Sequence, residues 1–287
     1  MDSGVIEQLT SDNKISVFPQ YMTTERPDRV AQLVLSGCVA ILTDNSPVAL
    51  VLPVNINTFL ETSDDYYEKW EMASFQRILR YISVFLAMSL PAIYVSVVSY
   101  HMEILPENLV GIFKEARSGI PYSEFVEVFL MEIAFELIRE AGVRIPGAMG
   151  NAIGIVGGLI VGSAAVDASL ASPIVVIVVA LTALCSFTIP NSEFSAAFRI
   201  IKYFLWFFSA YFCLYGYVLG IILVFMHLGS LESYGFPYLA QLSYDRKNTA
   251  GYYDFMLRGP YKWMTKRKIF ARRSNTTRMK SNNDLNE

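Results

Sequence analysis

Cysteine and histidine are scarce in this sequence, whose 287 residues include three cysteines and two histidines. Cys38, Cys185 and Cys213 show no paired spacing, so the sequence suggests neither a disulfide framework nor a metal site. His101 and His227 lie far apart, and the sequence has no metalloprotease, serine-hydrolase or phosphate-loop motif. We therefore expect neither an enzyme nor a bound cofactor or metal ion.

Charged residues are also few, at 17% of the chain, whereas hydrophobic residues make up 53%. Charge is absent from runs that are too long for the core helices of an ordinary soluble protein. This balance argues against a soluble globular protein and favours a membrane protein. The chain begins MDSGVIEQLTSDNK, with acids where a signal peptide would have bases, so we expect no cleaved targeting signal.

Four uncharged runs predict four transmembrane helices, because about 20 apolar residues in a helix cross a hydrocarbon core of roughly 30 Å. Pro91 should kink the first helix, and the last run is long enough to tilt or to break near Gly216 and Gly220. The predicted fold class is mainly α: a polytopic helical membrane protein with about four transmembrane helices. The runs are residues 81–100, 145–166, 168–192 and 203–231.

The sequence before residue 80 has the pattern of a small α/β segment. Pro27 suits the first turn of a helix, and Gly37 suits its C-terminal cap. Two apolar, β-branched runs follow at 39–42 and 48–52, separated by turn-forming residues. This pattern predicts a β-hairpin.

A further helix is expected to begin at Asp64 and Asp65, whose charges suit a helix N-terminus and are interpreted as capping. Arg77 and Arg80 then precede the first run. Nine bases and no acid lie within residues 258–280, after the last run. Because bases flank cytoplasmic ends, and the predicted number of crossings is even, both termini should be cytoplasmic.

The basic tail is predicted to bind anionic membrane lipids, because it follows a transmembrane run directly and mixes bases with aromatic residues. Nucleic acid would also suit the charge but not the membrane-tethered position, so no nucleic-acid partner is expected. The lipid-binding candidates are Lys262, Lys266, Arg267, Lys268, Arg272 and Arg273.

These patterns divide the chain into three parts. Residues 1–80 form a partial soluble α/β segment on the cytoplasmic side. Residues 81–231 form the transmembrane helical domain, with an external amphipathic interval at 101–144. Residues 232–287 form the basic cytoplasmic tail.

Residues 123–141, between the first two runs, predict an amphipathic helix. Carboxylates near a membrane mouth concentrate cations, so its polar side is a candidate ion pathway. The alternative is an internal face on which Glu132 or Glu136 pairs with Arg139. Asp167, at the cytoplasmic end of the second run, either lies at the inner mouth or caps the next helix. The ion-pathway candidates are Glu132, Glu136, Arg139, Glu140 and Asp167.

Glycine recurs at every fourth position of the second run and gives one helix face without side chains. Such a face lets another backbone approach closely, so close helix packing is one interpretation. The other places this helix around a central pore in a symmetric ring, with a hydrophobic gate beside it. The residues are Gly150, Gly154, Gly158 and Gly162.

Four motifs follow one another along the chain: SVFPQYMTTERPDRVAQLVLSG at 16–37, PEN at 106–108, REAG at 139–142 and the glycine-rich run that ends in Ala171-Ser172-Pro173. Taken in this order, they resemble the A subunit of the GerA-type spore germination receptors. The resemblance extends from about residue 16 to the tail, and members of that family usually begin with a longer cytoplasmic domain. The first 80 residues are therefore expected to be the remnant of that domain.

The resemblance implies a function and partners. It implies a subunit in the inner membrane of bacterial endospores that acts with a permease-like B subunit and a lipoprotein C subunit to sense nutrients and trigger germination. It also implies a homo-oligomer that forms a nutrient-gated cation channel. A secondary transporter and a nonconducting receptor scaffold are the alternatives.

Overall fold

A computed structural model of the chain describes residues 3–144, 148–239, 254–260, 264 and 270, with the backbone alone for 148–156 and 159. Two compact units make up the chain, and the long helices α4 (Trp70–Tyr100) and α9 (Ser192–Ser230) contribute to both. Unit 1 is Met1–Ser83, Thr188–Ala197 and Val224–Glu287, and unit 2 is Val84–Phe187 and Phe198–Leu223.

Unit 1 contains a three-stranded antiparallel sheet in the order β1-β3-β2. The strands are β1 (Met22–Thr24), β2 (Val39–Ile41) and β3 (Ala49–Leu52), with Ala40 opposite Val51. The hairpin predicted from the two apolar runs is therefore confirmed as β2 and β3. The sequence did not predict β1, whose three residues pair with β3.

The short helices of unit 1 follow local sequence rules. They are α1 (Ser3–Thr10), α2 (Pro27–Leu35) and α3 (Ile56–Leu60). Proline starts α2, and Gly37, at φ +107°, follows its end, as the sequence predicted. Asn55 caps α3, since its side chain accepts from the Thr58 N–H while the Thr58 hydroxyl accepts from the Asn55 N–H.

The helix predicted to begin at Asp64 is only the three-residue 3-10 turn η1 (Asp64–Tyr66), and α4 starts later. Aromatic side chains form the core of unit 1. Phe59 stacks on Phe194 with ring centroids 5.0 Å apart, and Tyr238 is fully buried. A small ribbon of β4 (Glu232–Ser233) and β5 (Phe236–Pro237) joins this core, since the Ser233 hydroxyl donates to the Gln20 carbonyl.

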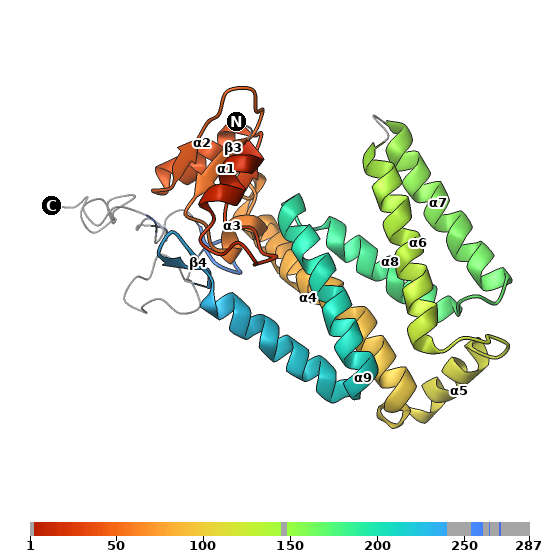
Figure 1. Ribbon diagram of the computed structural model, residues 1–287. Helices are drawn as coiled ribbons and strands as arrows, with labels where there is room; N and C mark the ends of the chain where they lie inside the picture. Colours follow the sequence, from red (N-terminus) through yellow and green to blue (C-terminus); the bar gives the residue numbers. More distant parts are fainter. Residues whose placement is uncertain (1–2, 145–147, 240–253, 261–263, 265–269, 271–287) are drawn as a thin grey trace. The chain divides into compact units, whose positions relative to one another are not determined.

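Unit 2 is helical. Besides parts of α4 and α9 it contains η2 (Met102–Ile104), α5 (Glu107–Ala116), α6 (Glu124–Arg144), α7 (Ala148–Asp167) and α8 (Pro173–Phe187). The helix predicted at 123–141 is confirmed as α6, but its predicted apolar side, with Leu130, Ile133 and Leu137, is exposed while Glu132 is buried. Figure 1 shows α6 and α7 side by side. Each of the four uncharged runs also contains a helix, in α4, α7, α8 and α9. Helix α5 was not predicted.

Within the described residues, two helices are long and apolar enough to cross a membrane, namely α4 with 31 residues and α9 with 39. The third run forms α8, whose 15 residues rise about 22 Å along the helix axis, which is short of a bilayer core. The count of four crossings, like the boundaries of the three predicted parts, stays a prediction.

Helix α9 is broken at Cys213, where φ is +57° and ψ is −145°. Figure 1 shows its ribbon as two limbs that meet at a bend. Gly216 lies directly against the Phe208 backbone, and Gly220 lies against the Leu205 side chain, so the limbs pack on each other beside the bend. The two glycines that the sequence marked as possible breaks therefore serve the contact between the limbs.

Candidate functional site

Charged side chains of α6 pair with bases of α9 inside unit 2. We call Glu132, Glu136, Arg139, Arg199 and Lys202 the α6–α9 network. On α6 its members are three or four residues apart and share one helix face, and the two bases of α9 are three apart. Glu136 accepts from Arg199, and the Glu132 carboxylate lies 2.5 Å from the Lys202 ammonium.

The Glu132–Lys202 pair is buried, because each side chain is 7% exposed. Lys202 Nζ contacts Glu132 Oε2 and lies 5.0 Å from the Tyr203 ring centroid. Within the part of the chain that is described, Glu132 Oε1 has no hydrogen-bond partner. Truncation of either member would leave a buried charge unpaired, which costs about 3–5 kcal/mol.

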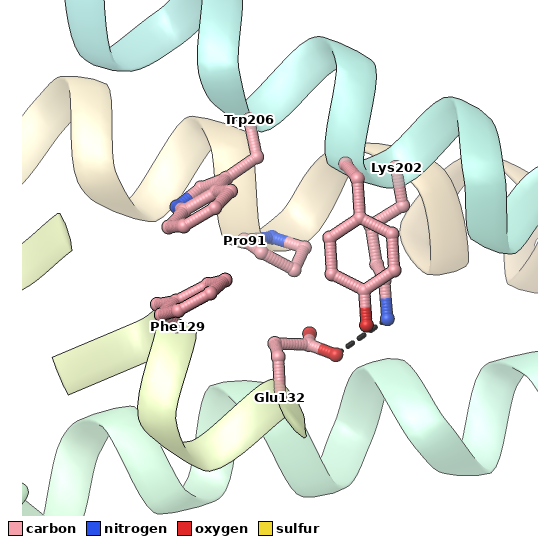
Figure 2. Close-up of a pocket in the computed structure, with 6 residues that line it drawn as sticks. Pro91, Phe129, Glu132, Lys202 and Trp206 are labelled. Carbon is pink, nitrogen blue, oxygen red and sulfur yellow. Dashed lines mark hydrogen bonds and ion pairs between the residues drawn. The ribbon is translucent and has the colours of Figure 1, made fainter. Parts of the chain in front are cut away.

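Aromatic rings surround this pair. Trp206 of α9 lies parallel to Phe129 of α6, with ring centroids 5.6 Å apart and 5° between the planes. Figure 2 shows Glu132 pointing from α6 toward Lys202, with Pro91 of α4 beside them. The pocket has no room for a further water-sized particle. The charges therefore lie in a dry, aromatic-lined space.

Arg139 and Glu140 have different surroundings, although they are adjacent in sequence. Arg139 donates to the Ser186 hydroxyl at 2.6 Å, stacks over the Phe187 ring and lies 3.8 Å from Glu136. Glu140 is exposed and pairs with Arg144 at 2.6 Å, away from the network. The predicted pairing of Glu136 with Arg139 is thus present but weaker than the pairing with α9.

The sequence analysis missed Arg199 and Lys202, which are the strongest partners on this face. They lie between the third and fourth uncharged runs, at three-residue spacing on the first limb of α9. The sequence signal that could have identified them is the helical spacing of two bases just before an apolar run.

The glycine face of α7 packs within the chain at the positions whose surroundings are described. A Cβ added to Gly158 would lie 3.6 Å from Phe135 of α6, and one added to Gly162 would lie 3.3 Å from Val176 of α8. Gly150 and Gly154 lie in the helical backbone of α7. Away from this face, Ser163, Ala164 and Asp167 are exposed.

Asp167 is the last residue of α7 and does not cap α8. That position is held by Ser172, whose hydroxyl accepts from the Val175 N–H at 3.3 Å. The Ser172 N–H in turn donates to the buried Glu127 carboxylate at 3.0 Å. Asp167 is therefore an exposed carboxylate at the end of the helix.

Unit 1 holds a second buried group of charges, the Arg77 cluster of Asp65, Arg77, Arg80, Asp254 and Arg258. Arg77 donates to Asp65 at 3.0 Å and to Asp254 at 2.8 Å, and Arg80 donates to Asp65 at 2.8 Å. Arg258 donates to the Glu68 carbonyl and lies over the Tyr66 ring. The cluster fixes residues 254–258 to the start of α4.

Asp65 was interpreted as a capping residue, and it does accept from the Thr62 N–H at the start of η1. It is also buried and ion-paired, which the sequence did not predict. Burial alone would raise its pKa, but the guanidinium groups of Arg80 and Arg77 outweigh burial and hold the pKa below its ordinary value. Asp64 instead pairs at the surface with Arg26.

The predicted lipid-binding bases lie outside the described residues, so their role stays a prediction. They are Lys262, Lys266, Arg267, Lys268, Arg272 and Arg273. Among the side chains that the structure does describe, no group of three or more His, Cys, Asp or Glu is placed to hold a metal ion.

Glu7 of α1 lines a cleft together with Glu193, and burial and this second carboxylate raise its pKa to about 7. The folded chain therefore holds a proton that the unfolded chain releases above about pH 4.5. The stabilisation of the folded chain by this bound proton is complete below that pH and is lost as the pH rises through 7. Since Glu7 is only half-buried, we expect a loss of about 1 kcal/mol.

Urea unfolding of Glu7→Gln, at pH values on both sides of this window, tests the effect. The substitution should flatten the fall in stability with rising pH. Exposed Glu25 provides the matched control, Glu25→Gln, which should keep the pH dependence of the unchanged chain. Equal pH dependence in both variants would contradict the assignment to Glu7.

Comparison with known proteins identifies the family. Residues 1–270 match the model of the Bacillus/Clostridium GerA spore germination protein. The chain belongs to this family. It is 42% identical over 262 residues to Spore germination protein A1 of Bacillus subtilis (strain 168), covering 91% of this chain and 54% of that protein. The family resemblance stated from the sequence is confirmed.

Two further relatives support the assignment of this chain to the GerA family. Uncharacterized membrane protein YfkQ of Bacillus subtilis (strain 168) is 41% identical over 267 residues, which are 93% of this chain and 52% of that protein. Spore germination protein XA of Bacillus anthracis is 32% identical over 287 residues, covering 100% of this chain and 58% of the relative. The chain spans about half the length of the curated relatives it matches, and no solved structure matches it.

Proposed function

We propose that this GerA family chain is a membrane subunit of a nutrient germinant receptor that triggers spore germination. The observation that carries the proposal is the family match over residues 1–270, together with relatives that are named spore germination proteins. Helices α4 and α9 support a membrane location, because both have the length and composition of transmembrane helices, and one relative is named a membrane protein.

The proposed location is the inner membrane of the endospore, with both termini cytoplasmic. The bases within 258–280 support this orientation, because basic segments next to transmembrane helices stay on the cytoplasmic side. The proposed partners are membrane lipids, a permease-like B subunit, a lipoprotein C subunit and further copies of this chain.

Within this receptor we propose that the subunit forms a nutrient-gated cation channel in which α7 lines the pathway. Gly158 and Gly162 pack on α6 and α8, which leaves Ser163 and Asp167 exposed on α7. A small hydroxyl and a carboxylate suit a water-filled path better than they suit lipid. An acidic residue at the mouth of such a path concentrates cations.

Cation flux through the reconstituted receptor tests this role. The complete receptor, with its B and C subunits, is placed in liposomes and monovalent cation flux is measured after nutrient addition. Asp167→Lys should lower the flux severalfold, because a positive charge at the mouth repels cations. Asp44→Lys changes an exposed acid of a turn in unit 1 and should leave the flux unchanged.

The other outcomes separate the alternatives. Equal flux in both variants would remove Asp167 and the α7 pathway from the proposal. A receptor that triggers germination without ever conducting ions would favour the nonconducting scaffold. Uptake of the nutrient driven by an ion gradient would favour the secondary transporter.

A further inference from the structure

The Glu132 carboxylate uses only one of its two oxygens. Oε2 lies 2.5 Å from Lys202 Nζ, while Oε1 is buried and has no partner among the described residues. A buried charged acceptor left without a partner is costly, so such groups are rare, and a bound ion is one reason for them. Figure 2 shows this carboxylate pointing away from α6 into the space beside Pro91 and Lys202.

The surroundings of Glu132 favour a cation. The rings of Phe129, Tyr203 and Trp206 line the same pocket, and aromatic faces attract positive charge. Lys202 already exploits this environment, with its ammonium 5.0 Å from the Tyr203 ring. A buried carboxylate next to aromatic rings is thus a cation site, and in this structure its occupant is a side chain.

The remaining charges limit which cation fits. Pro91 of α4 brings no charge, α6 adds Glu136 and Arg139, and α9 adds Arg199. Glu136 is already matched by Arg199, so Glu132 offers a single negative charge. One carboxylate balances a single positive charge, and the two guanidinium groups disfavour any further charge, so a monovalent cation fits better than a divalent one.

We propose that Glu132 is a binding position for a monovalent metal cation such as potassium, and that Lys202 is its tethered occupant, which must withdraw before the cation enters. No space beside Lys202 admits even a water-sized particle, so the two cations exchange rather than bind together. This inference rests on the proposed channel: the exchange in the buried pocket between α6 and α9 would regulate conduction along α7 without lying in the path itself.

Removal of the tethered occupant tests the site by binding, without any measurement of flux. Lys202→Met keeps most of the apolar stem and removes the ammonium. In the full chain in detergent, raising potassium from about 1 mM to about 100 mM, with N-methylglucamine keeping the ionic strength constant, should raise the unfolding temperature of this variant by a few degrees. The matched control is Lys202→Met combined with Glu132→Gln, which lacks the carboxylate and should show no such rise.

A second measurement on the unchanged chain covers the case in which Lys202→Met does not fold. The rate of Lys202 acylation by a small reagent should increase when potassium replaces N-methylglucamine, because the displaced ammonium becomes accessible. Potassium that changes neither the unfolding temperature of Lys202→Met nor the acylation of Lys202 would overturn the proposal. Potassium binding in a receptor that carries no flux would support the site and refute only the channel.

Discussion

Replacing Arg77 with leucine should lower the free energy of unfolding of unit 1 by about 3–5 kcal/mol, because the substitution removes the guanidinium group that two buried aspartates share. The Arg77 side chain is 1% exposed and donates to both Asp65 and Asp254. Without it, Asp65 keeps Arg80 and Asp254 keeps the Tyr66 hydroxyl. The Asp254–Arg258 segment should then detach from α4.

A matched control for Arg77→Leu is available on the surface of the same unit. Arg26 also pairs with two aspartates, Asp28 and Asp64, but its side chain is 51% exposed. Exposed ion pairs contribute little, so Arg26→Leu should change stability far less. The measurement is urea unfolding of the purified chain in detergent, with limited proteolysis to detect release of residues 254–258. Equal losses of stability in the two variants would contradict the role assigned to burial.

Gly216→Ala should also destabilise the chain, by about 3 kcal/mol, because the added methyl group has no space. A Cβ at this position would lie 2.0 Å from the Phe208 carbonyl oxygen, which is backbone and cannot move aside as a side chain can. The two limbs of α9 would have to separate beside the bend at Cys213. The expected result is a lower unfolding temperature of the chain in detergent.

Gly229→Ala tests the same substitution in the same helix without the clash. Position 229 has open space around its Cβ, so alanine should be neutral or slightly stabilising there, as expected for a helix. If Gly216→Ala proved as stable as Gly229→Ala, the limbs of α9 would not pack as the structure describes.

Local patterns in the sequence predicted the parts of the fold that local interactions determine. Proline at the start of α2 and Gly37 after its end are sufficient to define that helix. The β2–β3 hairpin follows from two apolar runs around a turn. Strand β1 could not be predicted, because three residues carry no periodicity and their pairing partner lies in β3, more than twenty residues away.

Only the α6 side of the candidate site was predicted from the sequence. The charged face of α6 was recognised from its spacing, but Lys202 follows Glu132 by 70 positions and Arg199 follows Glu136 by 63. Such pairings arise from tertiary packing and leave no local pattern. The same reason explains why the ion pairs of Asp65 were missed, since its partners come from α4.

The bend in α9 shows a third limit of prediction from the sequence. Glycines 216 and 220 marked the region as breakable, yet the left-handed residue is Cys213. A residue with a side chain seldom adopts that conformation, so the packing between the limbs must stabilise it. The glycines are needed instead where the limbs approach each other closely.

Nutrient-triggered release of monovalent cations from spores tests the central claim most directly. Spores that lack the gene for this chain, and spores in which the gene has been restored, are compared for a panel of single nutrients. The account predicts that release in response to at least one nutrient is lost in the first and regained in the second. Unchanged release for every nutrient in spores lacking the chain would contradict it.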